Sequence, residues 1–152
     1  MIHWNESITI AASIETVWSL FADKNIRRIM PKVDEHVLIE KTEGEVGAKH
    51  RQSYREGNRV ETYIVETLAY EDREDEKRKQ IHFLLANMFE TTLTFTLRKI
   101  DDTHTSLTYE GQNEGVNFAA KAMLKLSPKK SNDKVIQDFL RLVEQEATKV
   151  EV

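Results

Sequence analysis

The sequence predicts an α+β fold in which one antiparallel β-sheet is covered by a long, interrupted helical region near the C-terminal end of the chain. Three observations favour this fold class. A strand runs directly into a helix at Ser7–Phe21, the apolar pattern has a period of two residues from Val33 to about Gln112, and a helical period returns after Gly115. The predicted order is strand, two helices, six strands and a helical region, within a single domain of residues 1–152.

Composition and charge narrow the function classes. The chain is 39% hydrophobic, enough for a core, and its net charge of −4 comes from mixed signs. We therefore expect no nucleic-acid partner, since such proteins usually carry a basic face. The absence of cysteine excludes disulfides, thiol catalysis and thiolate metal sites. No apolar run resembles a signal peptide or reaches the ~18 residues of a membrane span, so we expect a cytoplasmic protein without stable membrane insertion.

The first strand and two helices follow from local patterns. Residues 2–11 are predicted as a strand, because Ser7-Ile8-Thr9-Ile10 alternates polar and apolar side chains and Ile8 and Ile10 form a core-facing pair. Ser13 then takes the position of a helix N-cap. The helix at about 14–22 follows, and its apolar residues recur at i, i+3, i+4 and i+7: Ile14, Val17, Trp18 and Phe21. A second short helix, at about 24–30, ends at Pro31 because proline interrupts helical hydrogen bonding.

Six further strands are predicted at 33–41, 49–55, 59–70, 80–88, 90–99 and 103–112. Short turns join them, which favours an antiparallel meander. Strand 59–70 is apolar on both faces, so the pattern does not assign its inner face. The nine consecutive charged residues Glu71–Lys79 are interpreted as a solvated hairpin tip.

The C-terminal region is predicted to be helical with one break. Val116–Leu126 is helical in character, and Ser127-Pro128 interrupts it with a cap and a first-turn proline. The final helix is expected at about 133–149. Its apolar stripe consists of Ile136, Phe139, Leu140, Val143 and Ala147. We expect the break to let the helix lift and admit a ligand.

The junction of the first strand and helix resembles the opening of the SRPBCC superfamily, which includes START lipid-transfer domains, polyketide cyclases and birch-pollen-allergen-like proteins. An I-x-A-x-x-E-x-V-W pattern joins strand to helix there. The matching residues are Ile8-Thr9-Ile10-Ala11-Ala12-Ser13-Ile14-Glu15-Thr16-Val17-Trp18. Asp23, the segment ending at Met30-Pro31, the Gly44–Gly47 turn and the closing helix also agree, so the resemblance covers essentially the whole chain.

This resemblance implies a helix-grip fold, in which a curved seven-stranded antiparallel sheet wraps around the C-terminal helix and leaves an internal cavity. Members use the cavity for lipids, sterols, polyketides, plant hormones or other hydrophobic metabolites. Some members are cyclases or dehydratases, and others bind a partner protein. The resemblance identifies no subfamily that is tied to one substrate.

A ligand cavity is also expected on physical grounds, because side chains alone do not easily fill a strongly curved sheet closed by one helix. The apolar candidates for ligand contact come from the sheet and the helical region. They are Phe83, Leu85, Leu93, Phe95, Tyr109, Phe118, Met123 and Phe139. The alternative interpretation is that these residues form an ordinary packed core.

Three polar residues of strand 49–55 are candidates for a polar wall of that cavity. His50, Gln52 and Tyr54 alternate with charged residues and therefore share the inner face. An unpaired buried polar group costs about 1–3 kcal/mol, so these residues either satisfy one another or contact a ligand or water. Asn87, at the inward end of the fifth strand, is expected to join them. The alternative is that this end of the sheet is open to solvent.

Other site chemistries are weakly indicated. The five histidines show no metal-binding spacing, and we predict neither a metal nor a cofactor. They are His3, His36, His50, His82 and His104. The chain has no nucleophile elbow and no phosphate-binding glycine loop, so the sequence assigns no catalytic residue. His50 beside Tyr54 leaves acid–base chemistry open.

Two surface features have alternative interpretations. A basic cluster surrounds the helix break and is either a solvated joint or a site for an anionic membrane surface. It contains Lys125, Lys129, Lys130 and Lys134. Leu84, Ala86 and Met88 lie on the predicted outer face of the fifth strand, where apolar residues indicate a homodimer contact.

The leading functional hypothesis is a binding or carrier protein for a small hydrophobic molecule, lipid or polyketide-like, held between the sheet and the C-terminal helix. A cyclase, dehydratase or hydrolase that uses the same cavity is the first alternative. The second alternative is a protein-interaction module that resembles the chaperone-ATPase activator homologues of the superfamily.

Overall fold

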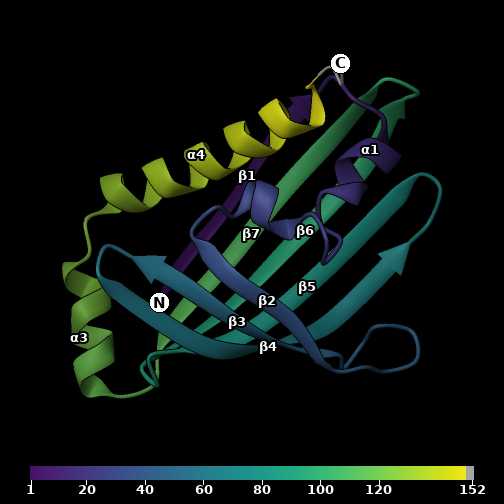
Figure 1. Ribbon diagram of the computed structural model, residues 1–152. Coiled ribbons are helices and arrows are strands. Elements are labelled where there is room, and N and C mark those ends of the chain that lie inside the picture. The colour runs from purple at the N-terminus through teal and green to yellow at the C-terminus, as the bar shows by residue number, and fades with distance from the viewer. Residues whose placement is uncertain (150–152) are drawn as a thin grey trace.

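The computed structural model describes residues 1–149 and shows a seven-stranded antiparallel sheet with helices at one end and along one side (Figure 1). The elements are β1 (Ile2–Ile10), α1 (Ile14–Ser19), α2 (Ile26–Ile29), β2 (Val33–Glu40), β3 (Lys49–Glu56), β4 (Arg59–Asp72), β5 (Glu76–Leu85), β6 (Phe89–Asp101), β7 (His104–Gly115), α3 (Phe118–Leu126) and α4 (Lys129–Ala147). The predicted fold class and element order are confirmed.

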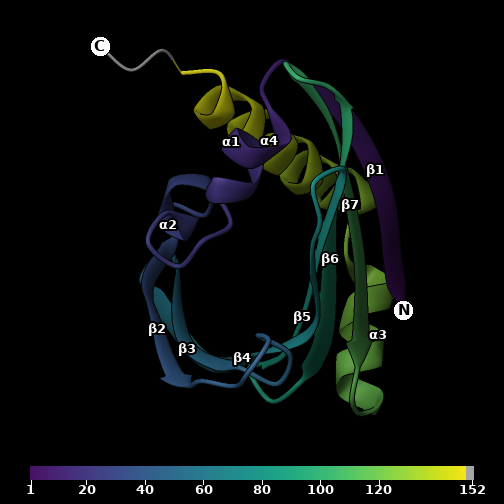
Figure 2. The ribbon, with the colours of Figure 1, turned by 90° about the vertical axis from the view of Figure 1, so that its right-hand side faces the viewer.

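The sheet is strongly curved. Its strand order is β1-β7-β6-β5-β4-β3-β2, so the two strands that come first in the chain lie at opposite edges. Figure 2 shows the sheet bent into an open ring, with α1 and α2 bridging from the β1 side to the β2 side. The α4 helix packs against β1, α1 and α2 and covers one end of the ring. This arrangement is the predicted helix grip.

The core forms where α1 and α4 meet the inner face of the sheet. Ser13 caps α1 as predicted, its hydroxyl accepting a hydrogen bond from the backbone N–H of Thr16 at 3.2 Å. The predicted helical stripes point into this core, and their burial holds both helices on the sheet. Its fully buried members include Ile10, Val17, Leu20, Leu97, Leu107, Leu140 and Val143.

The charged segment Glu71–Lys79 is not the solvated hairpin tip that the sequence predicts. Strand β4 continues to Asp72 and β5 already begins at Glu76, so only residues 73–75 form the turn. Most of the charged run therefore belongs to two paired strands, and half of those strand positions face the protein interior.

Two lysines of this run lie on the inner face of β5. The register places Lys77 opposite Leu97 and Lys79 opposite Phe95, and both of these β6 residues are fully buried. Because side chains alternate along the strand, the side chains of Lys77 and Lys79 both point toward the core. A high density of charged residues does not indicate exposure here, because strand alternation and the register with β6 determine which face each residue occupies.

Smaller differences concern strand ends and strand parity. Strand β5 ends at Leu85 rather than residue 88, because Ala86 and Asn87 adopt positive φ angles of 53° and 56° in the following turn. In β4, Tyr63 and Val65 are buried, which assigns the inner face that the sequence left open.

The break in the C-terminal helical region is confirmed at Ser127-Pro128. The α4 helix begins at Lys129, earlier than predicted, and Pro128 directly precedes it. Ser127 does not cap α4; its hydroxyl donates back to the carbonyl of Met123 at 3.2 Å and ends α3. None of the helices in residues 1–149 is both long and apolar enough to cross a membrane.

Candidate functional site

A small internal cavity lies between the α1–α2 segment and the inner face of the sheet. Its volume is about 20 Å³, room for a single water molecule. The wall is mostly apolar with five polar positions, which carry two imidazoles, an amide, a hydroxyl and an amine. It consists of Phe21, Ile26, Met30, His36, His50, Gln52, Val65, Thr67, Lys79, Ile81 and Phe95.

A larger surface depression adjoins this cavity. It has a volume of about 220 Å³ and is lined by Trp18, Ser19, Phe21, Ala22, Asp23, Glu45, Tyr70 and Lys79. Because Phe21 and Lys79 line both spaces, these two side chains form the partition between the depression and the cavity. A third, open depression of about 480 Å³ lies over polar residues of β1, β7, β6 and β5, away from the cavity.

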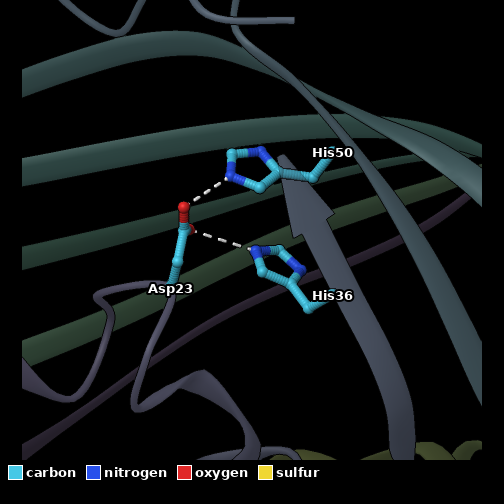
Figure 3. A group of neighbouring side chains, drawn as sticks. All are labelled: Asp23, His36 and His50. Atoms are coloured by element: carbon cyan, nitrogen blue, oxygen red, sulfur yellow. Dashed lines mark hydrogen bonds and ion pairs between the residues drawn. The ribbon is translucent and has the colours of Figure 1, made fainter. Parts of the chain in front are cut away.

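Asp23, His36 and His50 form a hydrogen-bonded cluster (Figure 3), in which both imidazoles line the cavity and Asp23 lines the adjoining depression. Asp23 lies between α1 and α2 and directs one carboxylate oxygen to each imidazole. Its Oδ1 lies 3.2 Å from Nε2 of His36, and its Oδ2 lies 2.9 Å from Nε2 of His50. The two imidazole rings stack with their centroids 4.4 Å apart. The carboxylate therefore ties the helical segment to β2 and β3.

The cluster continues into the core through Gln52. Nδ1 of His36 lies 2.8 Å from Oε1 of Gln52, and Nε2 of Gln52 donates to the hydroxyl of Tyr63 at 2.9 Å. Tyr63 in turn stacks on Phe83 at 4.7 Å between ring centroids. His50 and Gln52 are thus hydrogen-bonded to Asp23, His36 and Tyr63 from other elements, and not to one another as the sequence analysis considered.

The charge of Asp23 is stabilised within this cluster. Hydrogen bonds from His36 and then His50 lower the pKa of its carboxyl group far below the ordinary value of 3.8, and burial opposes them only in part. A carboxyl group whose pKa falls on folding stabilises the folded state above its unfolded pKa. This contribution is lost as the pH falls from about 3.8 toward the folded value.

We expect the Asp23→Asn variant to lose about 1 kcal/mol of unfolding free energy at neutral pH, because a neutral amide replaces a charge-assisted acceptor. Its stability should also fall less steeply than that of the wild type below pH 3.8. Urea unfolding over a pH series measures both effects. Parallel pH profiles for the two proteins would show that Asp23 is not held by the imidazoles.

The same cluster contains the residues within 1–149 that could hold a metal ion. The donor atoms of Asp23, His36 and His50 all lie within 4.8 Å of one another. Sequence spacing missed this group, because its members come from a loop and two strands. Each donor atom has a hydrogen-bond partner inside the group, and the prediction that the protein binds no metal stays a prediction.

Lys79 is the second functional candidate that sequence reasoning missed. Its side chain lies on the inner face of β5 and forms no ion pair with another residue of the described chain. Burial lowers the pKa of its amine, and the carboxylates of Asp23 and Glu45 counteract this only in part. The cavity wall therefore contains a desolvated amine in addition to the two imidazoles.

The predicted site residues fall into three groups. His50, Gln52 and Phe95 line the cavity. The others that pack in or against the core are Tyr54, Phe83, Leu85, Leu93, Tyr109 and Phe139. Three lie elsewhere: Asn87 is exposed in the β5–β6 turn, and Phe118 and Met123 are exposed on α3. The prediction that these three face the interior is wrong.

The space between the sheet and α4 is filled by aromatic rings. Phe139 of α4 lies 4.7 Å from Tyr109 and 5.7 Å from Phe95, measured between ring centroids, and Tyr109 stacks on Phe95 at 5.2 Å. The cavity therefore lies under α1 and α2, whereas the sequence analysis expected it under the C-terminal helix.

Comparisons with known proteins agree with this fold. A family model described as "Polyketide cyclase / dehydrase and lipid transport" matches residues 1–134. A search of curated proteins finds no match.

Similar solved structures include the Zhui aromatase/cyclase from Streptomyces sp. R1128, with 15% identity, a TM-score of 0.69, and 95% of this chain and 94% of that chain covered. A START superfamily protein from Mycobacterium smegmatis has 15% identity and a TM-score of 0.70, with 95% and 96% covered. Ginseng major latex-like protein 151 from Panax ginseng has 16% identity and a TM-score of 0.68, with 97% and 98% covered. At these identities the likeness shows the fold alone.

Proposed function

Because the chain belongs to the family of polyketide cyclases, dehydrases and lipid-transport proteins, we propose that it binds a small, mostly apolar molecule that carries one anionic or strongly polar group. The binding site is the cavity under α1 and α2 together with the adjoining depression. The observation that carries this proposal is the amine of Lys79, which has no ion-pair partner among residues 1–149 and lies at the partition between a mostly apolar cavity and the surface.

The chemistry of the wall supports this ligand class. Phe21, Ile26 and Ile81 offer apolar contacts, which supply most of the affinity in small-molecule sites. Lys79 supplies a donor for a carboxylate or phenolate, and an anion beside it would compensate for the loss of its hydration. The imidazoles of His36 and His50, which line the same cavity, would orient a second polar atom. A ligand reaches this space from the depression when Phe21 and Lys79 move aside.

A second candidate is an enzyme of the cyclase or dehydratase type, favoured by the hydrogen bond between Asp23 and His50. A carboxylate that orients an imidazole at a cavity wall is suited to transfer protons to and from a bound ligand. The interaction-module alternative agrees with the filled space under α4. It gives no reason, however, for a desolvated lysine at the cavity that has no ion-pair partner in the described part of the chain.

The direct test uses 8-anilinonaphthalene-1-sulfonate, an aromatic anion whose fluorescence rises in apolar sites. We expect saturable binding to the folded protein and competition by medium-chain fatty acids, together with a co-purified small molecule in native mass spectrometry. If the wild type binds the probe no more tightly than the Lys79→Glu variant does, the proposed site is wrong. Turnover of a bound polyketide-like ligand would favour the enzyme.

Gln52 and Tyr54 provide a matched pair of variants on the same strand face. Gln52→Leu leaves Nδ1 of His36 and the hydroxyl of Tyr63 without their partner, so we expect a loss of about 2 kcal/mol in unfolding free energy and weaker probe binding. The hydroxyl of Tyr54 is not part of the hydrogen-bonded cluster, so Tyr54→Phe should change the unfolding free energy by less than about 0.5 kcal/mol. Thermal unfolding and probe titration measure both. If both variants bind the probe as tightly as the wild type does, the polar residues of β3 do not contribute to the binding site.

A further inference from the structure

The α3 helix presents large apolar side chains to solvent. Phe118 is 88% exposed and Leu126 is 83% exposed, and Met123 on the same helix is also exposed. Ala120 and Leu124 are the buried residues of α3. Each is two positions, about 200° of helical arc, from an exposed apolar residue: Ala120 from Phe118, and Leu124 from Leu126. The helix therefore has two apolar faces, of which one packs on the protein and the other has no partner in the described chain.

The geometry of the β7–α3 junction fixes this orientation. A Cβ atom on Gly115 would lie 2.5 Å from the backbone nitrogen of Lys121, so the helix backbone rests directly on the end of β7. Only small or short side chains fit between them, and Ala120 occupies that position. The large residues Phe118 and Leu126 consequently point away from the sheet.

Lysines accompany the exposed apolar face. Residues 116–135 contain five lysines and one aspartate, a net charge of +4, whereas the whole chain has −4, so the remainder carries −8. Within the described chain, Lys121, Lys125, Lys129 and Lys130 form no ion pairs, and Lys134 pairs only with Asp138 on its own helix. One pole of an acidic protein is thus strongly basic.

We propose that α3 and the first turn of α4 dock the protein reversibly on an anionic lipid bilayer. An amphipathic helix with large apolar residues on one face and lysines beside them is the chemistry of interfacial membrane helices. Phe118 and Leu126 enter the boundary between headgroups and acyl chains, and the lysines contact anionic headgroups. The surface needs no ligand in the cavity, so the proposal is independent of the proposed function.

The position of α3 suits a flat partner. Figures 1 and 2 show the helix at one end of the molecule, beside β7 and outside the ring of the sheet, so a planar surface reaches it without meeting other elements. A second copy of the chain fits less well. A twofold contact would place the same lysine-rich surface against itself, and like charges across an interface oppose association.

The test is cosedimentation of the full chain with phosphatidylcholine vesicles, with and without phosphatidylserine. We expect binding only to the anionic vesicles and release at high salt, because salt screens the lysine contacts. Lys125→Glu with Lys129→Glu should weaken binding by at least about 25-fold, since each lysine contributes about fivefold. Phe118→Ser with Leu126→Ser should weaken it at least about tenfold through lost apolar burial.

Matched controls keep the outcome unambiguous. Lys24→Glu with Lys41→Glu makes the same charge change on exposed residues elsewhere, and Ile100→Ser removes an exposed apolar residue near the β6–β7 turn. Both controls should bind vesicles as the wild type does, and circular dichroism should show that every variant is folded. The proposal is overturned by equal binding to neutral and anionic vesicles, or by equal loss in the controls. A wild-type dimer that the α3 variants convert to a monomer would also overturn it, because a second copy would then cover this face.

Discussion

Replacing Lys79 with methionine is expected to stabilise the protein and impair its binding of an anionic ligand. Methionine is one atom shorter but similarly unbranched, and it removes an amine that is desolvated and has no ion-pair partner in the described chain. We expect the unfolding free energy to rise by about 1–2 kcal/mol, as when buried charges are replaced by apolar residues of similar volume. The affinity for 8-anilinonaphthalene-1-sulfonate should fall at least about tenfold, since a charged hydrogen bond is lost. This combination is typical of a residue retained for function.

The pH dependence of this effect has a definite sign. Burial lowers the pKa of Lys79 below its ordinary value of 10.5, so the unfolded chain binds more protons between the folded pKa and 10.5. The unfolding free energy of the wild type therefore rises with pH across that window. Below the window the amine is charged in both states, and the destabilising effect of Lys79 is largest. The advantage of Lys79→Met should be greatest at neutral pH and vanish above 10.5.

Chemical unfolding of the two proteins over a pH series measures this difference. Lys24→Met, a change at an exposed lysine, is the matched control and should leave both stability and probe binding unchanged. If Lys79→Met destabilises the protein at neutral pH, the amine must have a stabilising partner, and the proposed ligand contact would lose its basis.

Lys77, two residues earlier on the same face, should respond in the opposite direction. Its side chain is 2% exposed, and its amine forms ion pairs with Asp72 and with Glu15, the latter at 2.9 Å. Burial disfavours its charge, but the hydrogen bonds from the amine to these carboxylates outweigh burial and raise its pKa. We expect Lys77→Ala to reduce the unfolding free energy by about 2–3 kcal/mol. The figure is below that for a fully buried pair because water can hydrate both carboxylates once the amine is gone.

The contrast between two Lys77 variants separates charge from packing. Lys77→Met retains the apolar stem against Trp18, whose ring centroid lies 6.0 Å from the amine, and should lose only about 1 kcal/mol. Thermal and urea unfolding measure both variants. Equal losses in the two variants would mean that the ion pairs, and not the stem, account for the whole effect. No loss in either would show that the ion pairs of Lys77 with Asp72 and with Glu15 of α1 do not stabilise the fold.

Much of the fold could be predicted because it depends on local pattern. The Ser13 cap and the stripe of Ile14 and Val17 are read directly from helical spacing. The predicted inner face of β3 is also correct for His50 and Gln52, which are buried. Their alternation with charged residues indicates this face, whichever strands lie beside β3.

The candidate site was only partly predictable because its partners are distant in sequence. Asp23 is polar and lies on a loop, and nothing near it in the chain indicates two imidazoles from β2 and β3. Lys79 was hidden in a run of charges whose inner members are defined only by pairing with β6.

The periodicity of apolar residues likewise does not predict which face of α3 packs on the protein. Phe118 and Ala120 are both apolar, and the choice between the two helix faces depends on how closely the helix backbone approaches Gly115. Side-chain size at that contact, rather than hydrophobicity, turned Phe118 and Met123 outward.

The strand order also determines when the cavity can form during folding. The hairpins from β2 to β7 join neighbours in sequence, whereas β1 pairs Ile2 with Asn113, more than a hundred positions away. Closing so long a loop is entropically unfavourable until most of the sheet exists. We therefore expect the segment between β1 and β2, which carries Asp23, to be fastened at both ends late in folding. The pocket should then form only after the residues of β7 have been synthesised.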